Sequence, residues 1–103
     1  MNITARLQEA TAPDHEVKSW PDKFEALVSF NDCYTHREIR KKDRDYKVGD
    51  IVKANEIRPY VGEYTGRWQR LVIKRVVEPG DRDPEAYGLK DGYCILEYER
   101  LVG

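Results

Sequence analysis

The amino-acid sequence predicts an α+β fold, a small antiparallel β-barrel with one main helix packed against it. About five segments alternate polar and apolar residues or are rich in β-branched residues, as strands are. One segment near the front has the apolar spacing of a helix, and most connections are short, which favours antiparallel neighbours. A length of 103 residues suits one domain, which we assign to residues 14–103, after an N-terminal extension of residues 1–13.

The front of the domain predicts a strand followed by the helix. In HEVKSW, residues 15–20, polar and apolar residues alternate, and Val17 can point into a core. A helix is expected over residues 21–31, because proline suits the first helical position. The apolar side chains of this segment recur at i, i+3 and i+4 and therefore share one helix face: Phe24, Leu27 and Val28.

The middle of the chain predicts a second strand, a charged turn and a third strand. The strand YTHREIR spans residues 34–40, with Arg37 and Ile39 on the face expected to meet the core. Residues two apart on its other face are His36, Glu38 and Arg40. The charged turn ends at a Gly-Asp pair, and a strand is expected over residues 51–57.

The last part of the chain predicts a hairpin and a closing strand. PYVGEYTGRW, residues 59–68, is expected to be a hairpin loop because it holds one proline and two glycines. The β-branched run over residues 67–78 predicts a central strand. Two prolines and three glycines make residues 79–92 a long loop, and residues 93–101 form the final strand.

Composition narrows the class of protein. The net charge of −1 means that any nucleic-acid surface must be a local patch. The sequence holds no run of eighteen apolar residues and no apolar signal core, so we expect a cytoplasmic protein that does not enter membranes. Cys33 and Cys94 are expected to be reduced thiols. Since no paired-cysteine or other ligand motif occurs, neither a metal nor a cofactor is expected.

A run of charge, REIRKKDRDYKVGD over residues 37–50, contains six basic and four acidic residues. One interpretation is a solvated turn with local ion pairs, each worth about 0–1 kcal/mol. The other is a rim that contacts phosphate, because Arg and Lys release counterions from a nucleic-acid backbone. The candidate phosphate-binding residues are Arg37, Lys41, Lys42 and Arg44.

Glu38 and Arg40 lie two apart on the predicted second strand, so both project from the same face. A carboxylate beside a guanidinium fixes both groups. In a cleft, the carboxylate could accept from a base edge or serve as a general base; the alternative is a structural ion pair at the strand edge. From the sequence, replacing Arg40 with alanine is expected to weaken binding without unfolding the protein.

Three residues around the first strand are further candidates for binding a ligand. His15 and Lys18 lie on the strand itself, although a lone histidine is as readily structural. Trp20, before Pro21, is either a core aromatic or, if exposed, a platform on which a base stacks. The aromatic residues around the predicted hairpin loop have the same two interpretations, stacking on a ligand or packing in the sheet: Tyr60, Tyr64 and Trp68.

Four segments, in this order, resemble a group of small phage and bacterial proteins in the ASCH superfamily: HEVKSWPDKFEALVSF, REIRKKDRDYKVGDIV, GEYTGR and YGLKDGYCIL. The resemblance covers residues 14–98 and implies the PUA-like β-barrel of that superfamily. It also implies a cleft between the first helix and the barrel, faced by a Glu-x-Arg strand that corresponds to Glu38 and Arg40. His15 and Lys18 would face the same cleft. Related PUA-like domains read modified or flipped bases.

Three functions are therefore open. The first is a monomeric module that binds RNA or a nucleotide, with Glu38 and Arg40 at a base edge. The second comes from a branch of the superfamily that hydrolyses N4-acetylcytidine with a Lys, a Thr and a Glu. The candidates here are Lys18, Thr35 and Glu38, with Glu78 as an alternative acid, but SFNDCYTHRE lacks the Gly-Lys-Lys of that branch. The third is a phage protein that engages a host protein.

Overall fold

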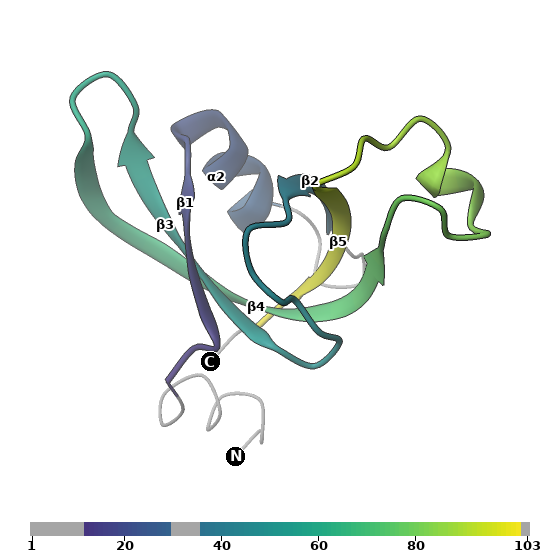
Figure 1. The fold of residues 1–103 in the computed structure, drawn as a ribbon. Helices are drawn as coiled ribbons and strands as arrows, with labels where there is room; N and C mark the ends of the chain where they lie inside the picture. The colour runs from purple at the N-terminus through teal and green to yellow at the C-terminus, as the bar shows by residue number, and fades with distance from the viewer. Residues whose placement is uncertain (1–11, 30–35, 102–103) are drawn as a thin grey trace, which may run out of the picture.

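The structure is a computed structural model that describes residues 12–29 and 36–101. Figure 1 shows the arrangement of an α-helix and a curled sheet in these ranges. In chain order the elements are β1 (His15–Ser19), α2 (Pro21–Ser29), β2 (His36–Lys41), β3 (Ile51–Arg58), β4 (Glu63–Val77), the short 3-10 helix η1 (Pro84–Ala86) and β5 (Tyr93–Arg100). The predicted α+β class and the single main helix are confirmed within these ranges. No helix among the described residues is both long and apolar enough to cross a membrane.

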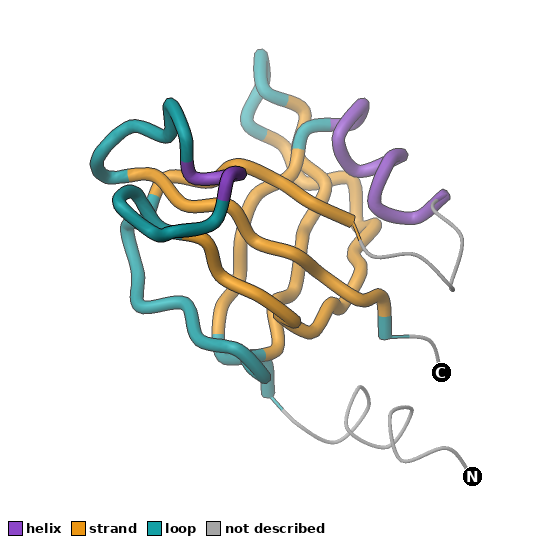
Figure 2. The backbone as a smooth tube through the Cα atoms, turned by 90° about the vertical axis from the view of Figure 1, so that its right-hand side faces the viewer, coloured by secondary structure: helices purple, strands orange, loops and turns teal. Residues whose placement is uncertain are grey.

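The five strands form one sheet in the order β1-β3-β4-β5-β2, and the sheet curls into a half-barrel (Figure 2). Four of its strands are antiparallel neighbours, as predicted. The prediction was wrong for β1, which runs parallel to β3 with Val17 opposite Ala54. Between these two strands the chain passes through α2 and β2, and a connection of that length permits a parallel pair.

Strand β2 presents the opposite face to the core from the one predicted. Ile39 is 63% exposed, whereas Glu38 on the other face is buried. Ile39 pairs in register with Ile95 of β5, so it has an apolar neighbour on the outer face. Glu38 finds polar partners inside. The alternation of residues was correctly predicted, but the direction was not, because a buried carboxylate is rare unless it is paired.

The β3–β4 hairpin is longer than predicted. Its loop covers residues 59–62, and residues 63–68, predicted as loop, are already in β4. Tyr64 pairs with Ile57 of β3. The glycine that suggested a loop, Gly66, has φ of 91° and lies where the register shifts between Asn55 and Ile57. The glycine therefore marks an irregularity inside the strand, where a positive φ is needed.

The core lies inside the curl of the sheet and is covered by the helix. Its buried members come from every strand but β2 and from α2, and include Val17, Leu27, Val52, Ala54, Leu71, Ile73, Cys94, Leu96 and Tyr98. Phe24 and Leu27 of α2 are fully buried, which confirms the predicted stripe. The helix begins as predicted, with the Phe24 amide donating to the Trp20 carbonyl at 2.7 Å. The helix ends at Ser29, whereas its predicted end at residue 31, and with it Cys33 and Thr35, lies outside the described residues.

Candidate functional site: a cationic cleft at the seam of the sheet

The two outer strands of the sheet, β1 and β2, approach each other through arginine side chains. Arg40 Nη2 donates to the Lys18 carbonyl at 3.3 Å, and Arg44 Nη1 donates to the Glu16 carbonyl at 2.6 Å. Glu16 and Lys18 are two residues apart on an edge strand, so their carbonyls point the same way. Without a strand on that side, these carbonyls need other donors, and the two guanidiniums supply them. We call this line of contact the seam.

Two cavities open at the seam. The larger, about 650 Å³, is lined by Glu16, Val17, Lys18, Arg40, Lys41, Asp43, Arg44, Tyr46, Asn55 and Tyr64. The smaller, about 260 Å³, is lined by Lys18, Ser19, Trp20, Lys23, Glu38, Ile39, Arg40 and Lys41. Both include Lys18, Arg40 and Lys41, so the contact from Arg40 to the Lys18 carbonyl lies between them. Together they form one cleft along the seam.

The charge of the cleft is positive. Four cations and two carboxylates line the larger cavity, and four cations and one carboxylate line the smaller. Within the described part of the chain, the ammonium groups of Lys18, Lys23 and Lys41 form no ion pair. Elsewhere on the surface most cations are paired, for example Lys74 with Glu99 at 3.5 Å. The cleft therefore concentrates unneutralised charge in a protein whose net charge is −1.

A buried polar cluster forms the floor of the cleft. Arg40 forms an ion pair with Glu38, and the two side chains are 18% and 6% exposed. The Tyr98 hydroxyl donates to Glu38 Oε1 at 3.3 Å and accepts from Arg40 Nε at 3.2 Å. Burial opposes the charge of the guanidinium, but Glu38 and Tyr98 outweigh this effect and raise the pKa of Arg40. Glu38 and Tyr98 thus fix the plane and position of the guanidinium.

Tyr98 should make stability fall at alkaline pH. Burial, and then the Glu38 carboxylate, raise the pKa of Tyr98 well above its ordinary value. The unfolded chain releases this proton near pH 10, at about the ordinary pKa of tyrosine, while the folded protein keeps it. Stability is therefore fully present below about pH 10 and is lost above it, by up to about 1.4 kcal/mol per pH unit. We expect Tyr98→Phe to be less stable at neutral pH and to lose less stability above pH 10.

Urea unfolding on both sides of that pH measures the effect. Tyr60→Phe is the matched control, because Tyr60 is fully exposed. A difference in stability between wild type and Tyr98→Phe that stays constant across the alkaline range would contradict the assignment of the raised pKa.

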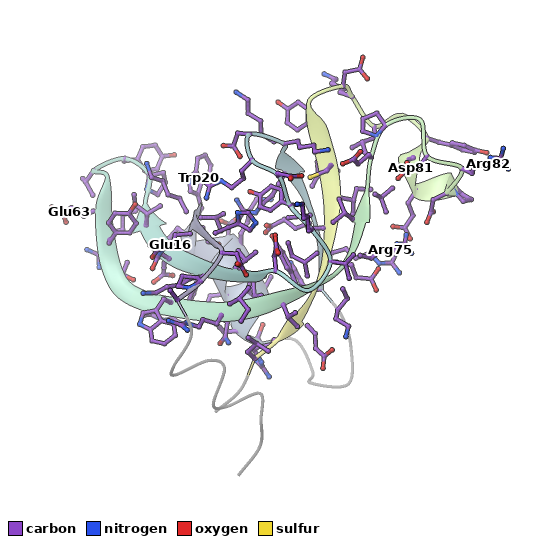
Figure 3. The ribbon with its side chains drawn as sticks, turned by 60° about the horizontal axis from the view of Figure 1, so that its bottom comes forward. Glu16, Trp20, Glu63, Arg75, Asp81 and Arg82 are labelled. Carbon is purple, nitrogen blue, oxygen red and sulfur yellow. The ribbon has the colours of Figure 1, made fainter. Side chains whose placement is uncertain are left out.

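Some of the other predicted site residues line the cleft in the structure, and others do not. Trp20 is 56% exposed beside the smaller cavity, and Lys41 and Arg44 line the cleft, as a phosphate-contacting rim requires. His15 lines neither cavity: its Nε2 lies 2.7 Å from Asp50 Oδ2, and its ring contacts Tyr46. In Figure 3, Glu16 and Trp20 lie on one side of the molecule, and the tip of the long loop at Asp81 and Arg82 lies on the other.

Two predicted phosphate ligands are directed away from the cleft. Arg37 projects from the outer face of β2, where it bonds Glu85 at 2.7 Å and lies 3.6 Å from Glu97. Lys42 forms an ion pair with Glu78. Because these cations are already paired outside the cleft, we leave Arg37 and Lys42 out of the proposed site.

The cleft also contains residues that the sequence analysis did not select. Ser19 follows Val17 by two, so the period of a strand places it on the same inward face. Lys23 precedes Leu27 by four, so it lies beside the buried stripe of α2. These spacings could have identified Ser19 and Lys23 as candidates from the sequence. Nothing in the sequence indicates that Asn55, from β3, reaches the same cleft. Tyr64, from β4, was one of the three aromatic residues considered for stacking, and it lines the larger cavity.

The residues that line the cleft determine which kinds of chemistry it can support. Lys18 and Glu38, two of the three catalytic candidates, line the same cavity, while Thr35 is outside the described residues. Over the described ranges, no three His, Cys, Asp or Glu side chains gather as a metal site would require. Flanking lysines, a fixed arginine and an exposed tryptophan form a surface suited to an anion attached to a flat apolar group.

Comparison with known proteins assigns the chain to a family. No curated protein matches the chain. A family profile matches residues 14–98, which include every element from β1 to most of β5 and the whole of the described cleft. The chain therefore belongs to the family described as Domain of unknown function (DUF3850).

Proposed function

We propose that the protein binds single-stranded RNA or a nucleotide in the cleft at the seam. The observation that carries this proposal is the convergence of Lys18, Arg40, Lys41 and Arg44 on two adjoining cavities. Lys18 and Lys41 have no carboxylate partner among the described side chains. Cations left unpaired at one place are the electrostatic footprint of a phosphate-binding surface.

Two aromatic side chains support a nucleic-acid ligand over a simple anion. Trp20 and Tyr64 are 56% and 57% exposed, and they line the smaller and the larger cavity. An exposed aromatic side chain beside a cationic groove provides a stacking surface for an unpaired base. Because the bases of a duplex are already stacked and paired, the proposal specifies a single strand or a free nucleotide.

Within this site Arg40 contacts the ligand and Glu38 positions Arg40. Glu38 Oε1 is engaged by both Arg40 and Tyr98, so that oxygen is directed inward. Both the Glu38 carboxylate and the Arg40 guanidinium line the smaller cavity. A guanidinium held in this way can donate to an acceptor on the ligand, either a phosphate oxygen or the edge of an unpaired base.

The PUA-like assignment is part of the same proposal. Within the described residues, the one α-helix, the curled five-stranded sheet and a Glu-x-Arg strand facing a cleft beside that helix support it. The parallel pairing of β1 with β3 must then be a feature of the barrel rather than a departure from it.

Removing the unpaired lysines should weaken binding and its dependence on salt. For a single strand, each lost phosphate contact lowers the slope of log K against log salt by about 0.7. We expect Lys18→Ala and Lys41→Ala each to reduce affinity roughly tenfold, the cost of one charged hydrogen bond. Anisotropy titrations of a labelled single-stranded RNA at two salt concentrations measure both quantities.

Lys74→Ala is the control, because it removes the same charge from a residue paired with Glu99 and outside both cavities. Equal losses in all three variants would show only a nonspecific effect of net charge and would contradict the site. Product analysis with N4-acetylcytidine runs in parallel, and turnover there would replace the binding proposal with the amidohydrolase. Capture of a protein partner that survives nuclease, without RNA affinity, would replace it with the host-protein function.

A further inference from the structure

We propose that the smaller cavity of the cleft is a site for a phosphate monoester, the terminal phosphate of a nucleotide or of an RNA strand. The inference that this cavity binds an oxyanion depends only on the geometry of the cavity. The inference that the phosphate belongs to a nucleotide rests on the function proposed above. The phosphate would then bind at the junction of β1 and α2, and not at the charged turn after β2 that the sequence indicated.

The first reason is that the smaller cavity is positively charged and has a size that suits a phosphate group. Lys18, Lys23, Arg40 and Lys41 surround a space of about 260 Å³. The only carboxylate among its described lining residues is Glu38, whose Oε1 is held by Arg40 and Tyr98. A phosphate monoester carries nearly two charges at neutral pH and three acceptor oxygens, whereas an internal phosphodiester carries one charge. A site with three unpaired lysines favours the monoester.

The second reason is an unsatisfied hydroxyl. Ser19 is 2% exposed and lines the cavity, and its Oγ has no hydrogen-bond partner. A buried hydroxyl without a partner is unfavourable, so native proteins rarely keep one without a reason. A phosphate oxygen in the cavity would accept from Ser19 Oγ. The unpartnered hydroxyl is an observation independent of the lysines, and it can donate to an acceptor such as a phosphate oxygen.

The third reason is the helix that begins at the cavity. Trp20 and Lys23, on either side of the first residues of α2, both line it. The first amides of a helix have no intrahelical partner, and the helix dipole favours an anion there. Asp22, in the same turn, lines a different hollow between α2 and β2, so its carboxylate does not occupy the smaller cavity.

The larger cavity then receives the nucleoside. It shares Lys18, Arg40 and Lys41 with the smaller one, so a single ligand can extend from one into the other past Arg40. Its other walls include Tyr64 for stacking and Asn55 for hydrogen bonds to a base. The ligand unit is therefore one nucleotide, with the phosphate against Ser19 and the base against Tyr64.

A ligand-truncation cycle tests this division. Calorimetric titrations of wild type, Ser19→Ala and Lys23→Ala use inorganic phosphate, a nucleoside, its 5′-monophosphate, and single-stranded RNA with and without a 5′-phosphate. Ser29→Ala is the matched control, because it removes the same hydroxyl from the exposed far end of α2. Ser19→Ala deletes an unpartnered group from the free protein, so it should fold normally, which thermal unfolding verifies.

We expect the added phosphate to improve wild-type affinity roughly tenfold or more, and Ser19→Ala and Lys23→Ala to lose most of that gain. Nucleoside affinity should stay unchanged in both variants. Tyr64→Ala should weaken the nucleotide and leave inorganic phosphate unaffected. Gain for the monophosphate but not for 5′-phosphorylated RNA would identify a free nucleotide as the source; gain for both would identify a strand terminus as well.

The failures are distinguishable. If RNA binds but a phosphate improves the affinity of neither the nucleoside nor the RNA, or improves it as much in Ser19→Ala as in wild type, the phosphate site is wrong and RNA binding stands. If inorganic phosphate binds through Ser19 while neither RNA nor any nucleotide does, the proposed function is wrong and the oxyanion site stands.

Discussion

Replacing Arg40 with alanine is expected to destabilise the protein by about 3–5 kcal/mol, because it leaves Glu38 buried without its ion-pair partner. The Glu38 side chain is only 6% exposed, so water cannot take the place of the guanidinium without a rearrangement of the floor. The substitution also removes a donor from the Lys18 carbonyl and so opens the seam. Chemical denaturation with urea measures the loss.

Arg37→Ala is the control for this prediction. Arg37 is on the same strand, but it is more than half exposed and its ion pairs are on the surface, so its removal should cost about 0–1 kcal/mol. Replacing both Arg40 and Glu38 with apolar residues of similar volume should recover much of the loss. An Arg40→Ala protein as stable as Arg37→Ala would show that the buried pair is not formed.

The structure changes the expectation drawn from the sequence, that Arg40→Ala would weaken binding and leave the fold intact. A loss of affinity in that variant would mix two effects. Arg40→Lys keeps the charge but not the planar fork, so it is the better variant with which to test recognition.

Replacing Phe24 with alanine, as a separate single substitution, is expected to lower the free energy of unfolding by roughly 3–5 kcal/mol. Phe24 is 1% exposed, and the Arg67 guanidinium lies 4.9 Å from the centre of its ring. Arg67 also bonds Glu25 of the same helix at 2.7 Å, so the loss of the ring loosens the attachment of α2 to β4. Because Trp20 and Lys23 are at the start of this helix, the smaller cavity should lose its shape as well.

Thermal unfolding and RNA affinity at low temperature measure the two effects. Val28→Ala is the control on the same helix, because Val28 is only partly buried and should cost much less. If Phe24→Ala were destabilised as expected but bound RNA as wild type does, α2 would not be part of the binding site.

The local elements of this fold were largely predictable, and the long-range pairing was not. The spacing of Phe24 and Leu27 and the proline at the helix start are local signals, and both were confirmed. The direction of β1 depends on how the chain returns after α2 and β2, which no local pattern encodes. Likewise Gly66 reads as a loop residue locally, but pairing with β3 keeps it inside a strand.

The site was predictable where it depends on strand periodicity. Glu38 and Arg40 share a face because they are two apart, and the structure brings them together at a cleft that Lys18 and Trp20 also line. Arg37 and Lys42 could not be sorted from Lys41 by charge, because their partners Glu85 and Glu78 come from distant segments. Arg44, which lines the cleft, is itself 3.5 Å from Asp43. Whether a cation is free or paired is a tertiary property.

The two tryptophans allow the central claim to be tested in one spectrum. Trp20 lies at the cleft, whereas Trp68 is on β4 between Lys53 and Arg70, outside both cavities. Their indole N–H groups give two separate NMR signals, which can be followed while single-stranded RNA is added. Binding in the cleft predicts that the Trp20 signal moves with saturation and the Trp68 signal stays in place. Movement of Trp68 alone, or of neither signal while RNA binds, would contradict the claim that the seam is the binding site.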